Sequence, residues 1–170
     1  DEDFWTIIYL HEGEQFKFAP QAGWGDDFGG QATVNDVAGA NITVDGTNLV
    51  AGKAGWYLLY IHNGSERTFT VLEPNVYLIG DTAGEWNVAD SHKFTVPTTE
   101  DGVFESPAFA NDAELRMCVS IDNFDWWKTE FIIFDGNIAY RGRGGDQERV
   151  AVKAGQKAYL NFAKGTGEIK

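Results

Sequence analysis

Two adjacent tryptophans, Trp126 and Trp127, lie in the polar stretch IDNFDWWKTE. Two neighbouring indoles in such a stretch can hardly both face a core, so we expect at least one of them to be exposed. An exposed indole presents a flat apolar surface to the C–H face of a sugar ring, and basic side chains beside it can donate hydrogen bonds to pairs of hydroxyl groups. These residue types favour carbohydrate binding as the chemistry of this stretch.

Basic residues accompany the tryptophan pair in an otherwise acidic chain. Lys128 follows the pair, Arg116 interrupts an apolar stretch ten residues before it, and Arg141 begins the glycine-rich segment RGRGG. A similar combination occurs earlier, where Lys17 precedes the segment QAGWGDDFGG with Trp24 between two glycines. A structural interpretation remains open for all of them, because tryptophans often fill the cores of small β-sandwiches and a strand arginine can pair with a surface carboxylate.

The chain lacks the residue constellations that are typical of enzymes and metal sites. It has no G-x-S-x-G segment, no phosphate-binding P-loop, and a single cysteine, Cys118, which cannot form an intramolecular disulfide. Carboxylates are too abundant in this acidic chain for any pair of them to indicate a glycosidase. The three histidines are widely separated and no loop has the spacing of an EF-hand. We expect no catalysis, no metal and no cofactor.

Composition narrows the class of protein further. The chain has 170 residues, of which 43% are hydrophobic and 14% aromatic, so it is long enough and apolar enough to bury a core. Its 26 acidic and 13 basic residues give a net charge of −13, which repels phosphate backbones and makes nucleic acid an improbable partner. No apolar run approaches the roughly 20 residues that span a bilayer.

Periodicity predicts an all-β fold. Short runs of β-branched and aromatic residues recur between clusters of Gly, Asn and Asp, without a sustained helical stripe. The pair Asn63-Gly64 predicts a type I′ hairpin turn. The expected strands cover residues 4–10, 15–19, 42–44, 55–62, 67–72, 75–79, 103–109, 114–120, 129–134, 149–152 and 157–162.

The two halves of the chain are similar to each other at an offset of about 100 residues. The segment VAGKAG at 50–55 matches VAVKAG at 150–155, and Phe16-Lys17-Phe18 corresponds to Leu115-Arg116-Met117. We therefore expect two tandem immunoglobulin-like β-sandwich modules, at residues 1–73 and 74–170. Because residues 76–99 have no counterpart before Asp3, we expect the first module to lack its opening strand and the chain to be a fragment of a longer protein.

The second half carries a family resemblance. The segment NVYLIGDTAGEW at 75–86, an apolar-basic-apolar strand, a tryptophan loop and KAGQKAYLNF at 153–162 resemble the C-terminal repeats of the SusE and SusF lipoproteins. Those proteins bind glycans at the outer-membrane surface of Bacteroidetes. The resemblance covers nearly all of residues 74–170, and residues 1–73 resemble the later part of the preceding repeat.

The resemblance implies tandem, non-catalytic modules that bind starch-like α-glucan or a related polysaccharide. It implies a lipid-anchored, surface-exposed protein of the outer membrane, attached through a segment missing from this chain, with other Sus-like outer-membrane proteins as partners. An adhesion or scaffold sandwich that packs against proteins and binds no glycan is the alternative. The glycan-binding residues that the resemblance implies are Trp86, Arg116, Trp126, Trp127, Lys128 and Arg141 in the second module, and Lys17 and Trp24 in the first.

Overall fold

The computed structural model describes residues 2–170, which form two compact units. The units are Asp1–Pro74 and Asn75–Lys170, with Pro74 at their junction. Both are built from strands, and the described residues contain only two short 3-10 turns, η1 (Asp90–His92) and η2 (Trp126–Thr129). The fold is therefore all-β, as the sequence predicts. Within residues 2–170 no helix is long and apolar enough to cross a membrane.

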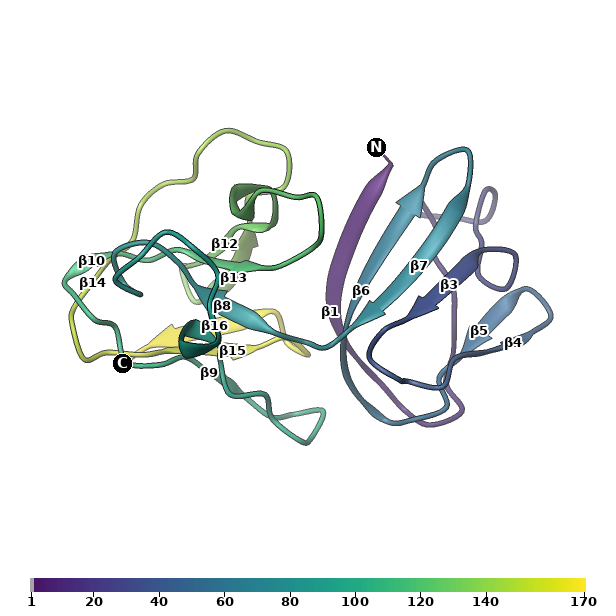
Figure 1. Cartoon of the computed structure of the whole chain (residues 1–170), viewed down its shortest axis with the longest axis horizontal. Coiled ribbons are helices and arrows are strands. Elements are labelled where there is room, and N and C mark those ends of the chain that lie inside the picture. The colour runs from purple at the N-terminus through teal and green to yellow at the C-terminus, as the bar shows by residue number, and fades with distance from the viewer. Residues whose placement is uncertain (1) are drawn as a thin grey trace. The chain divides into compact units, whose positions relative to one another are not determined.

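The first unit is a sandwich of two sheets. Figure 1 shows four of its strands side by side, in the order β1 (Asp3–Leu10), β6 (Gly55–Asn63), β7 (Arg67–Leu72) and β3 (Thr33–Asp36). The other sheet has the order β2 (Gln15–Phe16), β5 (Asn48–Val50) and β4 (Thr43–Asp45). One core lies between the sheets, because side chains of both contribute to it. Its buried members include Leu10, Tyr57, Leu59, Ile61, Phe69 and Val71 from the first sheet and Leu49 from the second.

The second unit contains a seven-stranded sheet and a separate pair of strands. The large sheet has the order β8 (Val76–Leu78), β11 (Met117–Val119), β12 (Phe131–Phe134), β13 (Asn137–Tyr140), β16 (Thr166–Ile169), β15 (Ala158–Asn161) and β9 (Phe104–Glu105). β10 (Ala113–Glu114) pairs with β14 (Ala151–Val152). The ring of Phe162, just after β15, contacts both Phe104 and Phe131. Since β12 and β15 are not neighbours in the sheet, these contacts mean that the sheet curls around one core.

The same strand pairings occur in both units. In the first unit β6 lies between β1 and β7, and in the second β15 lies between β9 and β16. The pairing of β2 with β5 likewise corresponds to that of β10 with β14. The second unit also pairs β8 with β11, and residues 2–74 contain no strand equivalent to β8. The immunoglobulin-like repeat inferred from the sequence is thus present in the strand topology.

The predicted hairpin forms, but the predicted type of turn is wrong. β6 and β7 are antiparallel, and the last paired residues are Asn63 and Arg67, which leaves a loop of three residues instead of a two-residue turn. Neither Asn63 nor Gly64 has the positive φ that a type I′ turn requires. A side chain at position 64 would require the His62 ring to move, because a Cβ there would lie 2.4 Å from its Nε2.

The predicted strand over residues 114–120 is interrupted. It consists of β10 and β11 with Leu115 and Arg116 between them, because the two halves pair with different partners, β14 and β8. This break places Arg116 where the chain passes from one sheet to another. Its neighbours Leu115 and Met117 are completely buried, while the Arg116 side chain keeps 16% of its surface exposed.

We expect the core of the first unit to depend on its aromatic cluster. The ring of Phe69 is buried and contacts the rings of Phe16 and Phe28, so Phe69→Ala should cost about 3–5 kcal/mol of unfolding free energy. Chemical denaturation followed by circular dichroism measures this loss. The control Val37→Ala, at a side chain that is 70% exposed, should change stability by less than about 0.5 kcal/mol. Equal effects of the two substitutions would contradict this description of the core.

Candidate functional site

The tryptophan pair lies on the short turn η2, beside the loop of residues 141–150 (Figure 1). The turn is fixed from inside by Thr129, whose buried hydroxyl donates to the carbonyl of Val119 at 2.6 Å. Trp127 is 38% exposed, whereas Trp126 is half-buried and packs against a small cluster of buried residues. The sequence expectation that at least one of the two indoles is exposed is therefore met by Trp127.

Trp86 belongs to a different loop but reaches the same place. Its indole is 52% exposed, and its ring centroid lies 5.5 Å from that of Trp126 with the planes inclined by 50°. The loop is closed by a hydrogen bond from the Gly80 amide to the Glu85 carbonyl at 2.8 Å. Gly80 has a φ of +84°, and a Cβ there would lie 3.0 Å from the indole of Trp86. Glycine at position 80 thus permits both the positive φ of the turn and the position of the Trp86 indole.

The loop that carries Trp86 is braced by a contact between Glu85 and His92. The carboxylate of Glu85 lies 2.9 Å from Nε2 of His92, whose side chain is buried. Nδ1 of the same ring lies 3.2 Å from the carbonyl of Asn87. Glu85 and His92 therefore join the residues on either side of Trp86 to the turn η1.

Two arginines and a lysine lie against the indoles. The Arg116 guanidinium carbon is 5.3 Å from the ring centroid of Trp86 and 5.4 Å from that of Trp126. Arg141 lies 5.3 Å from the Trp127 ring in the same way. These distances fall within the range of a cation–π interaction. In the second unit, the exposed indoles of Trp86 and Trp127 consequently each have a guanidinium beside them.

Lys128 is an exposed residue that lies beside Trp127. Its Nζ is 5.6 Å from the Trp127 ring centroid and 5.8 Å from that of Phe124. The structure thus brings together the six residues of the second unit that the sequence singles out: Trp86, Arg116, Trp126, Trp127, Lys128 and Arg141. We call this group the indole–arginine platform.

The arginines of the platform converge on two carboxylates that the sequence analysis did not select. Glu130 is completely buried, and its two carboxylate oxygens accept from Arg116 and Arg141, each at 3.1 Å. Asp146 also pairs with both arginines, at 3.5 and 3.4 Å, but its side chain is half exposed. A third guanidinium, that of Arg149, contacts both acids. Three positive charges are therefore neutralised in large part by two negative ones.

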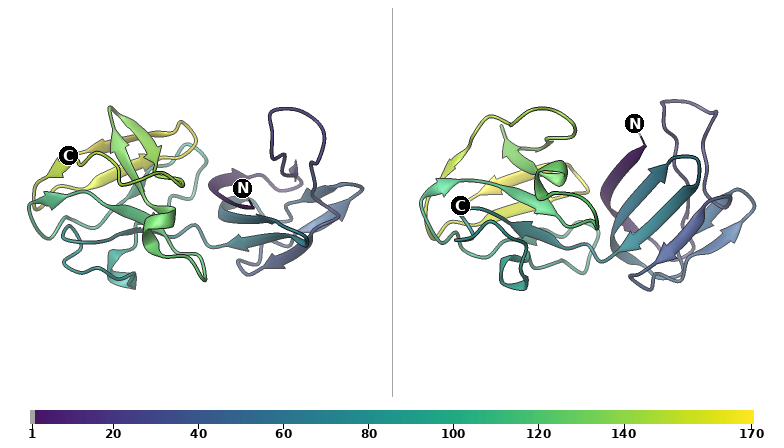
Figure 2. Two further views of the ribbon diagram at one scale, coloured as in Figure 1. Left: turned by 90° about the horizontal axis from the view of Figure 1, so that it is seen from above. Right: turned by 45° about the horizontal axis from the view of Figure 1, so that its top comes forward.

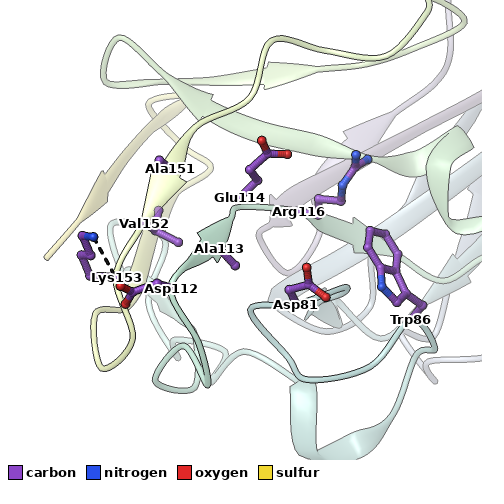
Figure 3. A pocket seen from close by; sticks show the side chains of 9 residues that line it. All are labelled: Asp81, Trp86, Asp112, Ala113, Glu114, Arg116, Ala151, Val152 and Lys153. Atoms are coloured by element: carbon purple, nitrogen blue, oxygen red, sulfur yellow. Dashed lines mark hydrogen bonds and ion pairs between the residues drawn. The ribbon is translucent and has the colours of Figure 1, made fainter.

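Hollows adjoin the platform on both sides of Arg116. One of about 330 Å³ is lined by Arg116, Trp126, Trp127, Arg141 and Asp146. The other, of about 420 Å³, is shown in Figure 3, where Arg116 and Trp86 lie near one another at one end and Asp112 and Lys153 lie at the other. Together the two hollows form a surface on which an extended ligand could cross from Trp127 to Trp86.

The first unit has a smaller group of the same kind. The loop between β2 and β3 stands out from its unit in both views of Figure 2, and Trp24 on this loop is 82% exposed. Nζ of Lys17 lies 4.8 Å from the Trp24 ring centroid and 2.6 Å from Oδ2 of Asp27. Lys17 and Trp24, which the sequence pairs as a candidate site, are thus in contact.

Other reactive groups do not gather at the platform. Within residues 2–170 no three His, Cys, Asp or Glu side chains are placed to hold a metal ion. Burial raises the pKa of the Cys118 thiol to about 12, and the charge of Glu130 adds to the shift. This cysteine is consequently a thiol at neutral pH and a poor nucleophile.

The comparisons with known proteins agree with the architecture. Residues 1–71 and 75–168 each match the sequence profile described as SusF/SusE starch-specific carbohydrate-binding modules. The chain belongs to the SusF/SusE family. It is 50% identical to the outer membrane protein SusF of Bacteroides thetaiotaomicron over 178 aligned positions, which cover 98% of this chain and 36% of that protein.

The fold matches a family member whose structure has been solved. The crystal structure of SusF from Bacteroides thetaiotaomicron has a TM-score of 0.94 to this chain at 49% identity, covering 99% of this chain and 40% of that one. The family resemblance seen in the sequence is therefore confirmed, together with the all-β tandem fold. The chain spans about two fifths of the length of these relatives.

We expect the position of the Trp86 indole to depend on Gly80. In Gly80→Ala the added methyl group would press on the indole and the residue would keep an unfavourable positive φ. The indole N–H signals of Trp86 and Trp126 should therefore shift in a heteronuclear NMR spectrum of the variant, while that of Trp24 stays in place. Gly84→Ala is the matched control, because it also has a positive φ but no atom lies within 4 Å of its Cβ position. Identical Trp86 shifts in the two variants would contradict the proposed contact.

We expect Asp27 to titrate at an unusually low pH. The hydrogen bond from Lys17, followed by that from the Gly25 amide, holds the pKa of this carboxyl below its ordinary value of 3.8. The stabilising effect of the pair is accordingly present above that ordinary value and is lost as the pH falls through the lowered pKa. Replacing Lys17 by Met should raise the Asp27 pKa, which NMR of the carboxyl carbon measures. An unchanged pKa in this variant would contradict the Lys17–Asp27 pair.

Proposed function

We propose that this chain binds starch-like α-glucan without catalysis, mainly through the indole–arginine platform of its second unit. The observation that carries the proposal is the joint placement of two exposed indoles and two guanidinium groups on one surface. Membership of a family described as starch-specific carbohydrate-binding modules supports it. The proposal covers this chain alone, whose relatives are much longer.

The inclination of the rings favours a curved glycan. Because an α-1,4-linked glucan coils, its successive sugar rings do not lie in one plane. Trp86 and Trp126 are inclined by 50°, so the indole surface is bent, whereas a flat ribbon such as a β-1,4-linked chain would suit coplanar rings. Stacking on the indoles supplies apolar contact, and the arginines supply hydrogen bonds to hydroxyl groups.

The arginines have donors left for a ligand. In residues 2–170, the ion pairs of Arg116 and Arg141 with Glu130 and Asp146 are all made through Nη1. This leaves Nη2 of each guanidinium for sugar hydroxyls. Glu130 itself is completely buried and occupied by arginines, which argues against its use as a catalytic acid on a bound glycan.

Lys17 and Trp24 of the first unit form a second, weaker site in this proposal. They offer one indole and one cation, against three indoles and three cations at the platform. Two weak sites on one chain gain from effective concentration, since binding at one raises the local concentration of glycan at the other. A polysaccharide would therefore be retained better than a short oligosaccharide.

The name of the relative SusF supports a proposal for the cellular location of this protein. SusF is named an outer membrane protein, and we propose the same location at the cell surface for the protein to which this chain belongs. Lipid attachment and association with other Sus-like outer-membrane proteins are parts of the same proposal. In this arrangement the module holds glycan at the surface and partner enzymes cleave it.

Affinity electrophoresis tests the binding proposal. We expect amylopectin in the gel to retard the chain, and Trp127→Ala to weaken the retention about tenfold or more, the loss expected for one stacking contact. Trp127 is the suitable choice because its indole is exposed, so the variant should keep its melting temperature. Trp126→Ala should also lower the melting temperature, since Trp126 packs against the buried cluster around Cys118.

Gels with dextran, xylan and mannan are the controls for linkage and sugar. Trp56→Ala is unsuitable as a control because that indole is buried. Tyr140→Phe, at an exposed ring outside the platform, should bind as the parent does. A chain that amylopectin does not retard would contradict the proposal and favour a protein-binding scaffold.

A further inference from the structure

Both units repeat one small arrangement of residues that includes an acid. In each unit an acidic residue lies three positions after a tryptophan and directly before a fully buried phenylalanine. These residues are Trp24, Asp27 and Phe28 in the first unit, and Trp127, Glu130 and Phe131 in the second. Phe131 is thus the residue of the second unit that is equivalent to Phe28 of the first.

Strand register brings the acid to a cation in both units. Phe28 pairs with Phe18, which directly follows Lys17, and Phe131 pairs with Met117, which directly follows Arg116. Because side chains alternate between the faces of a strand, the acid and the cation share the face opposite the buried pair. The same backbone register thus places Asp27 beside Lys17 and Glu130 beside Arg116.

The contacts agree with this register. Asp27 lies 2.6 Å from the ammonium group of Lys17, which itself lies against Trp24. Glu130 bonds Arg116 through one oxygen and Arg141 through the other. The Arg141 amide also donates to the Glu130 carbonyl at 3.0 Å. The three cations nearest to these acids, Lys17, Arg116 and Arg141, each contact an indole, and Arg149, 3.7 Å from Glu130, is not among them.

A fixed acid matters because Lys and Arg side chains are long and flexible. Without a partner, such a side chain samples many rotamers, and a ligand that needs one of them must restrict it on binding. A carboxylate that fixes the guanidinium in advance removes this cost from the binding step. Glu130 is well suited to this role, since complete burial keeps it from any direct contact with a ligand.

We propose that Glu130, and Asp27 at the equivalent place in the first unit, are positioning residues that hold the binding cations against the indoles. Glu130 holds Arg116 beside Trp86 and Trp126, and Arg141 beside Trp127. The inference rests on the proposed function, because the held cations serve a bound glycan. In this proposal Glu130 affects affinity without touching the sugar, because it is completely buried.

The test uses the whole chain and separates the two units. Glu130→Gln is made in a Trp24→Ala background, so that only the platform remains. We expect its retention by amylopectin to fall by about tenfold, the effect of losing hydrogen bonds to a charged group. Glu130→Asp keeps the charge and should recover part of the retention. Glu105→Gln, which breaks a pair with Lys157 away from the indoles, is the matched control and should bind as its parent does.

A readout without ligand accompanies the gels. Each tryptophan gives one indole N–H signal in a heteronuclear NMR spectrum. Glu130→Gln should move the signals of Trp86, Trp126 and Trp127 and leave that of Trp24 in the otherwise unaltered chain. Asp27→Asn should do the reverse, and Asp27→Glu should return the Trp24 signal toward its original position. Because Asp27 is partly exposed, its variants should fold. Asp27→Asn and Asp27→Glu therefore test the positioning role even if Glu130→Gln does not fold.

Each result has one meaning. Weakened retention together with shifted indole signals supports the inference. If no glucan binds the parent chain, the proposed function fails, and the signal shifts alone still support the positioning role of the acids. Folded Glu130→Gln and Asp27→Asn variants with unchanged indole signals overturn the inference. Retention of the Glu130→Gln variant by amylopectin equal to that of its parent also overturns the inference.

Discussion

The platform depends on one buried negative charge. Glu130 has no exposed surface, and a carboxylate in such a place is tolerated only when it is paired and hydrogen-bonded. Arg116 and Arg141 supply the pairing from two separate segments of the chain, so neutralising Glu130 and ordering the binding surface are the same event. The indoles are then placed around the arginines: Trp86 and Trp126 beside Arg116, and Trp127 beside Arg141.

The backbone supports this centre through breaks in regular structure. The strand that would run through Arg116 changes sheets there, and η2 exposes Trp127 while Trp126 packs inward, just before β12 begins. Gly80 lets the loop of Trp86 fold tightly under its own indole. The indole–arginine platform is consequently formed by loops whose ends are anchored in strands, and functional residues of β-sandwiches often lie on such loops.

The sequence predicted what depends on residue type and local spacing. The tryptophans and the basic residues of the platform could be selected because indoles and cations are scarce in polar stretches of an acidic chain. Glu130 was not selected, because it is one of 26 acidic residues and its complete burial is visible only in the structure. The equal spacing of Trp24 to Asp27 and of Trp127 to Glu130 is the signal in the sequence that points to these two acids. β3 was also missed, since TVND is short and polar and pairs in parallel with β7 through a distant part of the chain.

The near balance of charge among the three arginines and two carboxylates has a consequence for selectivity among polymers. The two carboxylates reduce the positive charge that the arginines offer to a uronic acid or a sulfate ester, and the net charge of −13 of the whole chain repels such polyanions at a distance. Neutral glycans meet no such barrier and displace no counterions when they bind. The proposed glycan binding should therefore favour uncharged polysaccharides over acidic ones and change little with salt concentration.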